Sequence, residues 1–367
     1  MYLINNHSNG MPFLLYSVNI EDAKFPSVDT YETSILSVTI KNATGNSVDF
    51  NKRNSLFAAF GEFNERLSMY HSTQNSIPKI QAFSMNETPS TFIEPTKIYL
   101  NLNMKSLSGY DKEFQDSCGV ASQINSNASM LASLLEFAER QSLIATWLGK
   151  QKRKRYKFKD ILYHLNQNDI LFSKTQTLMN KFSYFECYDI SIFSNIYVLF
   201  IIGFNSEHYA LGLSAGNSFL DAYSGALKEF FQCYFASQRI IGNTSAEKID
   251  LYKDYYLNIT IQDFYDSYKF LEESDTLYLH ENDLFDLTDN QLCIQAILES
   301  FKMLGIHSYI VSIPPHNKQT RLKITKVYSP DAFPHMYVPL LEPERYRICK
   351  LLNMNKFPNK GKQIPFP

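Results

Sequence analysis

The segments GEFNER at residues 61–66 and LEFAER at residues 135–140 share the pattern Glu-Phe-x-Glu-Arg. A third segment, LKEFFQ at residues 227–232, repeats the Glu-Phe pair and ends in glutamine. In each segment a second polar residue follows the first glutamate by three positions, which is the spacing of neighbours on one helix face. The three segments therefore predict three helices, each with an acid and then an acid or amide on one face.

Each segment also has a glycine at the same distance upstream. Gly45, Gly119 and Gly212 each lie seventeen residues before the first glutamate of their motif. Strand-like sequence comes before each glycine, namely ILSVTI, KIYLNLNM and HYAL (residues 35–40, 97–104 and 208–211). The unit is interpreted as strand, glycine turn and helix, and its irregular spacing indicates a divergent internal repeat.

Small residues precede the acid on each predicted helix face, and Ser55, Ser129 and Ser133 are among them. An isolated Glu-x-x-Glu-Arg motif is usually an exposed salt-bridge face, since Glu and Arg four residues apart support each other modestly. A solvated face normally carries long polar side chains along its whole length. The small residues therefore favour close approach of another backbone or of a ligand.

If the three helices converge, five carboxylates meet in one place. Clustered carboxylates repel one another and resist burial unless a cation lies between them. Oxygen-only ligands suit Mg²⁺, which commonly also holds phosphate oxygens. The pattern predicts a nucleotide–magnesium site whose metal ligands are Glu62, Glu65, Glu136, Glu139 and Glu229.

The usual phosphate-binding motifs do not occur in the sequence. Neither GxxxxGK[ST] nor GxGxxG is present, so the motifs support no P-loop, Rossmann or kinase-type nucleotide site. A net charge of −2 implies no bulk attraction to nucleic acid or to an anionic membrane. The one dense basic run, KQKRKRYKFK at residues 150–159, is interpreted as a solvated connector, with contact to a peptide or partner protein as the alternative.

Length and composition indicate a folded chain with a large core. Of its 367 residues, 44% are hydrophobic, including 28 Phe and 24 Tyr. We expect one domain over residues 1–367, with an elaborated middle at 145–190 and an ordered tail at 361–367.

Five cysteines without a CxxC pair favour a reducing cytoplasm. The start of the sequence does not resemble a signal peptide, and the longest apolar run, at 196–204, suits a buried strand and is too short to span a membrane.

The ordered set of motifs resembles the YcaO family, whose members bind ATP with two ExxER-type helices and one ExxQ helix. The matching segments are GEFNER, SLLEFAER and EFFQ. LLEFAERQSLIATWL, TKVYSPDAFPHM and the closing GKQIPFP are similar to the D proteins of microcin-type thiazole/oxazole synthetases. The resemblance runs from about residue 30 to the end. It implies a layered α/β fold of the YcaO type, with three strand–glycine–helix units around one ATP site.

The resemblance implies an ATP-dependent cyclodehydratase with ATP and Mg²⁺ as cofactors. A Cys, Ser or Thr side chain of a ribosomally made precursor peptide would attack the preceding amide carbonyl, and phosphorylation of its oxygen would let phosphate leave. The product would be a thiazoline or oxazoline. The implied partners are the precursor peptide, a leader-binding subunit resembling ubiquitin-activating enzymes and an FMN-dependent azoline dehydrogenase. Thioamide and amidine formation are sibling reactions that stay open.

The resemblance also implies roles for individual residues. Glu136, Glu139 and Glu229 are the expected catalytic acids, together with Pro367 at the end of the tail. The expected nucleotide-binding residues are Arg53, Ser55, Glu62, Glu65, Arg66, Ser129, Ser133, Arg140 and Gln232. The chain departs from the family where Arg-Ala often precedes the third motif, because it has Gly225-Ala226 there.

Two other functions stay open. GLSAG at residues 212–216 matches the G-x-S-x-G nucleophile elbow of α/β-hydrolases, with Ser214 as nucleophile and Asp286 and His307 or His335 as its partners. A glycine that begins each helix accounts for more than one copy of the repeat, whereas an elbow accounts for one. The second alternative is a non-catalytic YcaO-like scaffold subunit, although all five glutamates of the motifs are present.

Overall fold

The computed structural model describes residues 2–5, 15–22, 30–37, 43–71, 79–85, 89–100, 116–165, 169–240, 255–256, 258–280, 289–316 and 320–366. The chain divides into two compact units. The first unit is Met1–Phe137 with His307–Pro330, and the second is Ala138–Ile306 with Asp331–Pro367. Helix α2 (Ser126–Gly149) continues from the first unit into the second. The single domain expected over 1–367 stays a prediction.

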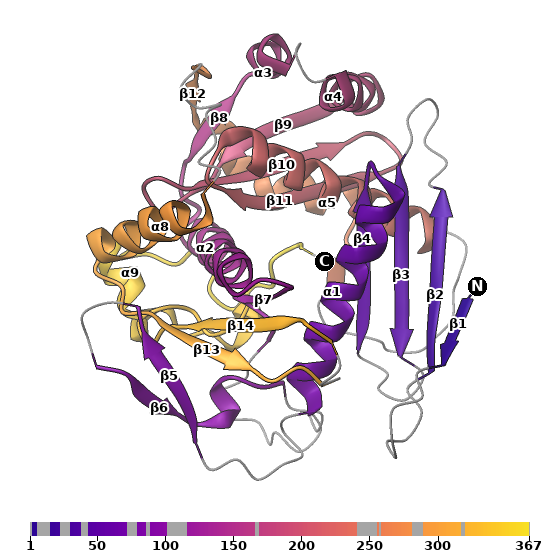
Figure 1. Ribbon diagram of the computed structural model, residues 1–367. Helices are drawn as coiled ribbons and strands as arrows, with labels where there is room; N and C mark the ends of the chain where they lie inside the picture. Colours follow the sequence, from indigo (N-terminus) through magenta and orange to yellow (C-terminus); the bar gives the residue numbers. More distant parts are fainter. Residues whose placement is uncertain are drawn as a thin grey trace. The chain divides into compact units, whose positions relative to one another are not determined.

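The first unit begins with a four-stranded antiparallel sheet. Its strands, in spatial order, are β1 (Tyr2–Asn5), β2 (Leu15–Asp22), β3 (Tyr31–Ser37) and β4 (Thr44–Asp49). Helix α1 (Lys52–His71) follows β4 and packs along β4 and β3 (Figure 1). Ile35 of the sheet and Ala59, Phe63 and Leu67 of α1 form the core between them.

A five-stranded antiparallel sheet completes the first unit. Its strands, in spatial order, are β6 (Thr91–Ile93), β5 (Ile80–Ser84), β13 (Tyr309–Ile313), β14 (Lys323–Tyr328) and β7 (Val120–Gln123). A short 3-10 helix, η2 (Pro95–Lys97), follows β6. The core of this sheet includes Val120, Val311 and Ile324, and Met69 from α1 packs against them. Helix α1 therefore contacts both sheets of the first unit.

The second unit contains another five-stranded sheet. Its strands, in spatial order, are β11 (Tyr209–Gly216), β10 (Tyr197–Phe204), β9 (Tyr184–Asp189), β8 (Lys154–Tyr156) and β12 (Asp275–Leu277). Only the β12–β8 pair among these is parallel. Helix α5 (Phe219–Ile240) packs on β11 and β10 (Figure 1).

Shorter helices complete the second unit. They are α3 (Phe158–Leu165), α4 (Asp169–Lys181), α7 (Ile261–Tyr268), η4 (Lys269–Glu273), α8 (Asn290–Leu304), η6 (Val338–Leu340), η7 (Pro343–Arg345) and α9 (Arg347–Leu351). No helix in the described ranges has both the length and the hydropathy needed to cross a bilayer. All five cysteines are buried free thiols.

The three motif helices occupy equivalent places in the fold. Helices α1, α2 and α5 each follow a strand, and these strands (β4, β7 and β11) are each the terminal strand in the order of a different sheet. The predicted strand–helix repeat and the α/β class are therefore confirmed.

The sequence predicted a turn at the glycine of each repeat, and this prediction is wrong for two of the three glycines. Gly45 and Gly212 lie inside β4 and β11, and only Gly119, with a φ of 71°, precedes its strand. A Cβ atom at Gly45 would lie 2.0 Å from the Ala59 carbonyl oxygen, and one at Gly212 would lie 1.9 Å from that of Ala226. These glycines are needed because the helix backbone passes directly over the strand.

The predicted strands agree with the structure unevenly. Residues 196–204 and 208–211 correspond to the buried strand β10 and to β11, and the prediction at 35–40 overlaps β3. The strand predicted at 97–104 is wrong in its described part, because Lys97 ends η2 and residues 98–100 are not in a strand. The strand that precedes α2 is the shorter β7.

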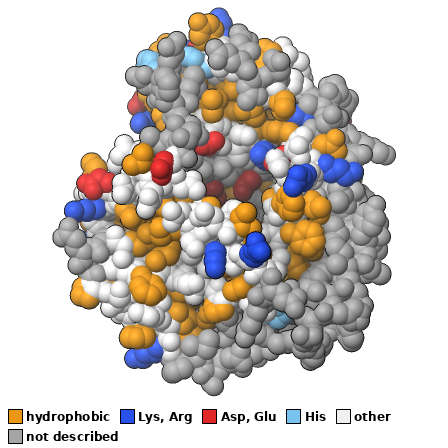
Figure 2. Space-filling model, in the orientation of Figure 1, with side chains coloured by type: hydrophobic (Ala, Val, Ile, Leu, Met, Phe, Trp, Pro, Cys, Tyr) orange, Lys and Arg blue, Asp and Glu red, His pale blue; other side chains and the backbone are white. Residues whose placement is uncertain are grey.

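The basic run at residues 150–159 is solvated at its lysines, as the sequence indicated, but it is more than a connector. It contains β8, which lies between β9 and β12. Burial lowers the pKa of Arg153 to about 10, and Lys152 forms an ion pair with Glu273 at 2.8 Å. Lys154 and Arg153 also act electrostatically on Asp189 of β9. The described Lys and Arg side chains on the face shown in Figure 2 lie in small separate groups.

Candidate functional site

The motif residues lie on the three predicted helices. They are Glu62, Glu65 and Arg66 on α1, Glu136, Glu139 and Arg140 on α2, and Glu229 and Gln232 on α5. Glu139 is buried and the others are half-buried. The residues up to Phe137 belong to the first unit and the others to the second.

In the first unit, carboxylates of α1 and α2 lie close together. Burial, followed by the negative charges of Glu136 and Glu62, raises the pKa of Glu65 well above its ordinary value. Arg66 and Lys326 act in the opposite direction. Arg66 also forms an ion pair with Glu62 at 2.7 Å. The first two motifs thus produce a crowded acidic group that two cations partly neutralise.

Sequence reasoning missed Lys326. This lysine of β14 is only 3% exposed, and its Nζ donates a hydrogen bond to the Asp116 carbonyl oxygen at 2.8 Å. Its charge acts on Glu65 and Glu136. The only signal in the sequence was its position within TKVYSPDAFPHM. Strand pairing, which places Lys326 opposite Val120 of β7, is what brings it near the acids.

In the second unit, two motif glutamates bind the backbone of β11. Glu229 Oε2 accepts a hydrogen bond from the Leu213 N–H, and Glu139 Oε2 accepts one from the Ala215 N–H, both at 3.2 Å. Leu213 and Ala215 are alternate residues of an edge strand, so both carboxylates lie along the same strand edge. Acids from the second and third motifs thus meet at β11.

The first glutamates of the first and third motifs are held in the same way, by a backbone N–H of the preceding strand. Glu62 Oε2 accepts a hydrogen bond from the Asn46 N–H at 2.6 Å, as Glu229 does from Leu213. Asn46 and Leu213 each follow the glycine of their repeat. In the middle repeat, the Val120 N–H donates to the Ser117 carbonyl oxygen instead. The first glutamate is therefore attached to its own strand in at least two of the three repeats.

The candidate serines bond to strands. Ser55, Ser129 and Ser133 are fully buried. Their hydroxyls donate to the carbonyl oxygens of Ser47, Ala121 and Thr325 at 3.0, 2.9 and 3.0 Å. Each hydroxyl therefore has a role in helix–strand packing. A contact with the nucleotide stays a prediction for all three.

The remaining candidates lie in different surroundings. Arg53 is exposed, with its guanidinium 5.2 Å from the centroid of the Phe57 ring. Arg140 Nε lies 3.3 Å from Glu139 Oε1, and its guanidinium lies 5.2 Å from the centroid of the Phe366 ring. Pro367 lies outside the described residues.

The tail that leads to Pro367 is packed against the second unit. Residues 363–366 are buried. The Trp147 indole N–H donates to the Lys362 carbonyl oxygen at 3.0 Å, and the Tyr268 hydroxyl donates to that of Pro365 at 2.9 Å. These contacts place Phe366 beside Arg140.

The hydrolase interpretation is wrong. Ser214 lies within β11, whereas a nucleophile elbow places its serine on the sharp turn between strand and helix. A Cβ atom at Gly225 would lie 2.1 Å from the Ser214 Oγ. Ser214 therefore occupies the space next to Gly225-Ala226, the pair that stands where the resemblance leads one to expect Arg-Ala. His335 is 1% exposed, and Asp286 lies outside the described residues.

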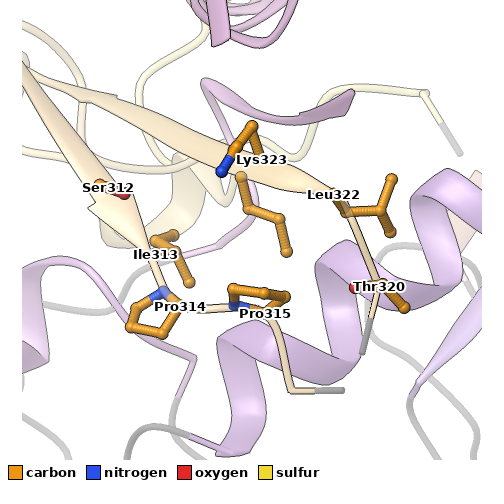
Figure 3. A pocket seen from close by; sticks show the side chains of 8 residues that line it. Ser312, Ile313, Pro314, Pro315, Thr320, Leu322 and Lys323 are labelled. Carbon is orange, nitrogen blue, oxygen red and sulfur yellow. The ribbon is translucent and has the colours of Figure 1, made fainter. Parts of the chain in front are cut away.

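Within the described ranges, no group of three or more His, Cys, Asp or Glu side chains is arranged to hold a metal ion. Among the predicted metal ligands, Glu62 pairs with Arg66, and Glu62, Glu139 and Glu229 accept hydrogen bonds from backbone N–H groups. Metal binding by the five glutamates stays a prediction. A pocket of about 330 Å³ lies at the end of the β13–β14 hairpin, where Pro314 and Pro315 face Leu322 and Lys323 (Figure 3). No acid of the motifs lines that pocket.

Comparison with known proteins identifies the family. Residues 93–332 match the family described as YcaO cyclodehydratase, ATP- and Mg²⁺-binding. This chain belongs to the YcaO family. The match covers the second and third motifs and most of the chain, so this YcaO protein is an ATP-dependent cyclodehydratase that uses ATP and Mg²⁺. A comparison with curated proteins gave no match.

Solved structures show the same YcaO fold. One is a chain of the E. coli microcin synthetase McbBCD complex, with 18% identity, a TM-score of 0.71, and coverage of 99% of this chain and 100% of that one. A heterocyclase in complex with substrate and cofactor gives 12% identity and a TM-score of 0.70, covering 96% of this chain and 54% of that one. YcaO from Methanopyrus kandleri bound with AMPPCP and Mg²⁺ gives 12% identity and a TM-score of 0.64, covering 86% of this chain and 85% of that one.

The residues of this YcaO chain fit a metal-bound nucleotide. The candidate ligands are all carboxylates, which suit Mg²⁺. In the first unit they are crowded enough to raise the pKa of Glu65, mainly through burial and the charge of Glu136. A bound divalent cation would relieve that crowding, because it would favour the charged carboxylates.

Proposed function

We propose that this YcaO protein converts Cys, Ser or Thr residues of a ribosomally made precursor peptide into thiazolines or oxazolines, as a subunit of a microcin-type azole synthetase. The observation that carries the proposal is the crowding of Glu65 with Glu62 and Glu136 in a YcaO chain. Coverage of the full length of a microcin synthetase chain supports the choice within the family.

The residues divide into three roles under this proposal. Carboxylates of the motifs hold Mg²⁺, whose charge would offset that of the ATP phosphates. These ligands are Glu62, Glu65, Glu136, Glu139 and Glu229. Arg66, Arg140 and Gln232 orient the acids or contact ATP, and exposed Arg53 is available to a phosphate. Ser55, Ser129 and Ser133 support the helices that carry these groups.

The reaction needs no nucleophile from the enzyme. The thiol or hydroxyl of the peptide forms the new bond to the amide carbon, and the amide oxygen leaves as phosphate. The five cysteines fit this view, because all are buried and burial raises the pKa values of Cys187 and Cys233. A thiol held in its neutral form is a poor nucleophile.

Other proteins would complete the pathway. We propose a separate leader-binding subunit resembling ubiquitin-activating enzymes, an FMN-dependent azoline dehydrogenase and a cytoplasmic location. The supporting finding is that the matched microcin synthetase is a complex of several chains, also solved with pro-MccB17 bound. We expect neither nucleic acid nor membrane as a partner.

Reconstitution with the neighbouring gene products and a candidate precursor peptide tests the proposal. We expect each ring to remove one water mass from the peptide and to release one ADP. Glu136→Gln and Glu229→Gln should slow ring formation by at least roughly tenfold to a hundredfold, while Glu299→Gln, on an exposed part of α8, serves as the control. Unaltered rates in the first two variants would refute the assigned site.

Calorimetric titration with ATP and Mg²⁺ separates this function from a scaffold. The proposal expects saturable binding when the partner proteins are present. A scaffold without catalytic function would bind no nucleotide and would still be required for a complex. Formation of a thioamide or amidine in place of a ring would identify a sibling reaction by its different mass change.

A further inference from the structure

Lys326 is a buried cation beside the acids of the first unit, and no motif accounts for it. Its side chain is enclosed at 3% exposure, and its Nζ donates to the Asp116 carbonyl oxygen at 2.8 Å. Enclosing an ammonium group is costly unless nearby negative charge compensates for the lost water. Besides this carbonyl, the negative charge of Asp116 favours the ammonium form of Lys326, and the charges of Glu136 and Glu65 add to it.

The turn that Lys326 contacts leads into the second motif. Asp116 Oδ1 accepts a hydrogen bond from the Cys118 N–H at 2.8 Å. The Val327 N–H, next to Lys326, donates to the Gly119 carbonyl oxygen at 2.8 Å. Lys326 therefore helps to fix the turn that precedes β7, and α2 with Glu136 begins directly after that strand.

Helix α1 approaches from the face of the sheet on which Lys326 lies. Side chains two residues apart on a strand share a face, so Lys326 lies on the same face as Ile324. Ile324 belongs to the core that includes Met69 of α1. Glu65 lies one helical turn before Met69 and therefore on the same side of α1. This arrangement brings the first motif toward the lysine.

We propose that Lys326 is a positioning residue, a fixed internal charge that holds the Glu65 and Glu136 carboxylates together before magnesium nucleotide binds. The proposal rests on the proposed function in that the acids it organises are the assigned metal ligands. Arg66 does not replace it, because the Arg66 side chain is 37% exposed and pairs with Glu62. Both cations act on Glu65 and Glu136, but only Lys326 of the two is enclosed, at 3% exposure.

A thermal-unfolding cycle without nucleotide or Mg²⁺ tests the charge coupling. The variants are Lys326→Met, Glu65→Gln and the double variant. Removing Lys326 should leave Arg66 as the remaining cation known to act on both acids, so Glu65→Gln should raise the unfolding midpoint more in the Lys326→Met background than in the wild type. Lys323→Met is the matched control, because Lys323 is an exposed lysine on the same strand.

Equal shifts in both backgrounds would overturn the proposal, since a purely structural lysine would show no coupling. If Lys326→Met alone does not yield folded protein, the double variant should. Recovery of the folded double variant supports the coupling, and failure to recover it contradicts the coupling.

The dependence of ATP turnover on Mg²⁺ gives a second readout. We expect Lys326→Met to raise the Mg²⁺ concentration for half-maximal turnover by roughly tenfold to a hundredfold, with a smaller change in kcat at saturating Mg²⁺ and partial rescue by Lys326→Arg. A loss of kcat alone would argue against positioning. If no peptide rings form but the unfolding cycle shows coupling, the proposed function fails while the role of Lys326 stands.

Discussion

The hydroxyl oxygens of Ser129 and Thr325 lie 2.8 Å apart, and those of Ser55 and Thr33 lie at the same distance. Thr325 is paired with Ala121 in the sheet, as Thr33 is with Ser47. In each case the helix serine binds both its own edge strand and the neighbouring strand. Two repeats with different sequences thus use the same contact to fix a motif helix on its sheet.

Ser129→Ala should reduce stability without changing nucleotide affinity if this contact is the whole role of the serine. We expect the free energy of unfolding to fall by about 1 kcal/mol, because a buried hydrogen bond is lost. Denaturant unfolding and the KM for ATP measure the two effects, with the exposed Ser126→Ala as control. A clear rise in KM would assign Ser129 to the nucleotide site.

Gly212→Ala should be among the most damaging small substitutions. Its Cβ atom would lie 1.9 Å from the Ala226 carbonyl oxygen, a backbone atom that cannot move aside without shifting α5. We expect a loss of about 3 kcal/mol or more in the free energy of unfolding. Gly61→Ala is the control, because its Cβ atom would lie 3.2 Å from the Ser122 hydroxyl oxygen and 3.8 Å from the Ser122 carbonyl oxygen. Similar losses in both variants would contradict the close strand–helix approach.

Glu65→Gln should stabilise the protein without ligands while lowering its activity. Burial and the charges of Glu136 and Glu62 raise the pKa of Glu65. A carboxyl group with a higher pKa in the folded state binds protons more strongly when folded, so it costs stability as the pH rises above its unfolded pKa. Thermal unfolding should therefore show a higher midpoint for the variant at pH 7 and nearly equal midpoints at about pH 4.

The exposed Glu299→Gln variant is the control for this pH dependence and should show no such difference. A variant of Glu65 that is less stable than the wild type at pH 7 would contradict the crowding of the acids. Added Mg²⁺ should stabilise the wild type more than Glu65→Gln.

Removing Pro365–Pro367 should slow turnover by roughly tenfold or more, since small displacements near a reacting centre are costly. The deletion removes the Phe366 ring beside Arg140 and the carbonyl that Tyr268 binds. Phe366→Leu separates the ring from the rest of the tail and should cost part of the same effect. Steady-state ATP turnover with the peptide measures both, and unchanged activity of the truncated protein would contradict a role for the tail.

The sequence was sufficient to predict the repeat, its helices and its acids. Small and acidic residues spaced by three, four and seven positions predict one face of a helix. A glycine at a constant distance from the first acid indicates a strand that the helix backbone crosses. What this spacing cannot report is whether the glycine is in the strand or in a turn. Gly45 has no positive φ and is needed because Ala59 and Phe63 of α1 lie directly over it.

Lys326 and the basic run show why other features were missed. Both depend on strand pairing between segments far apart in the sequence, 120–123 with 323–326 in one case and 154–156 with 275–277 in the other. A single sequence gives no register for such pairs, so it cannot show which charges are neutralised. The wrong strand at 97–104 has another cause. In its described part the adjacent residues Ile98 and Tyr99 are both buried, so the alternation of apolar residues in the sequence did not correspond to the two faces of a strand.

The hydrogen bonds from Leu213 and Ala215 to Glu229 and Glu139 also close an edge of the sheet. Unpaired N–H groups on a terminal strand are a template on which a second chain can add a strand and start aggregation. Carboxylates that occupy these groups block such pairing. Truncating both glutamates to alanine would therefore expose β11 to self-association, whereas glutamine at these positions keeps an oxygen that accepts the same N–H groups.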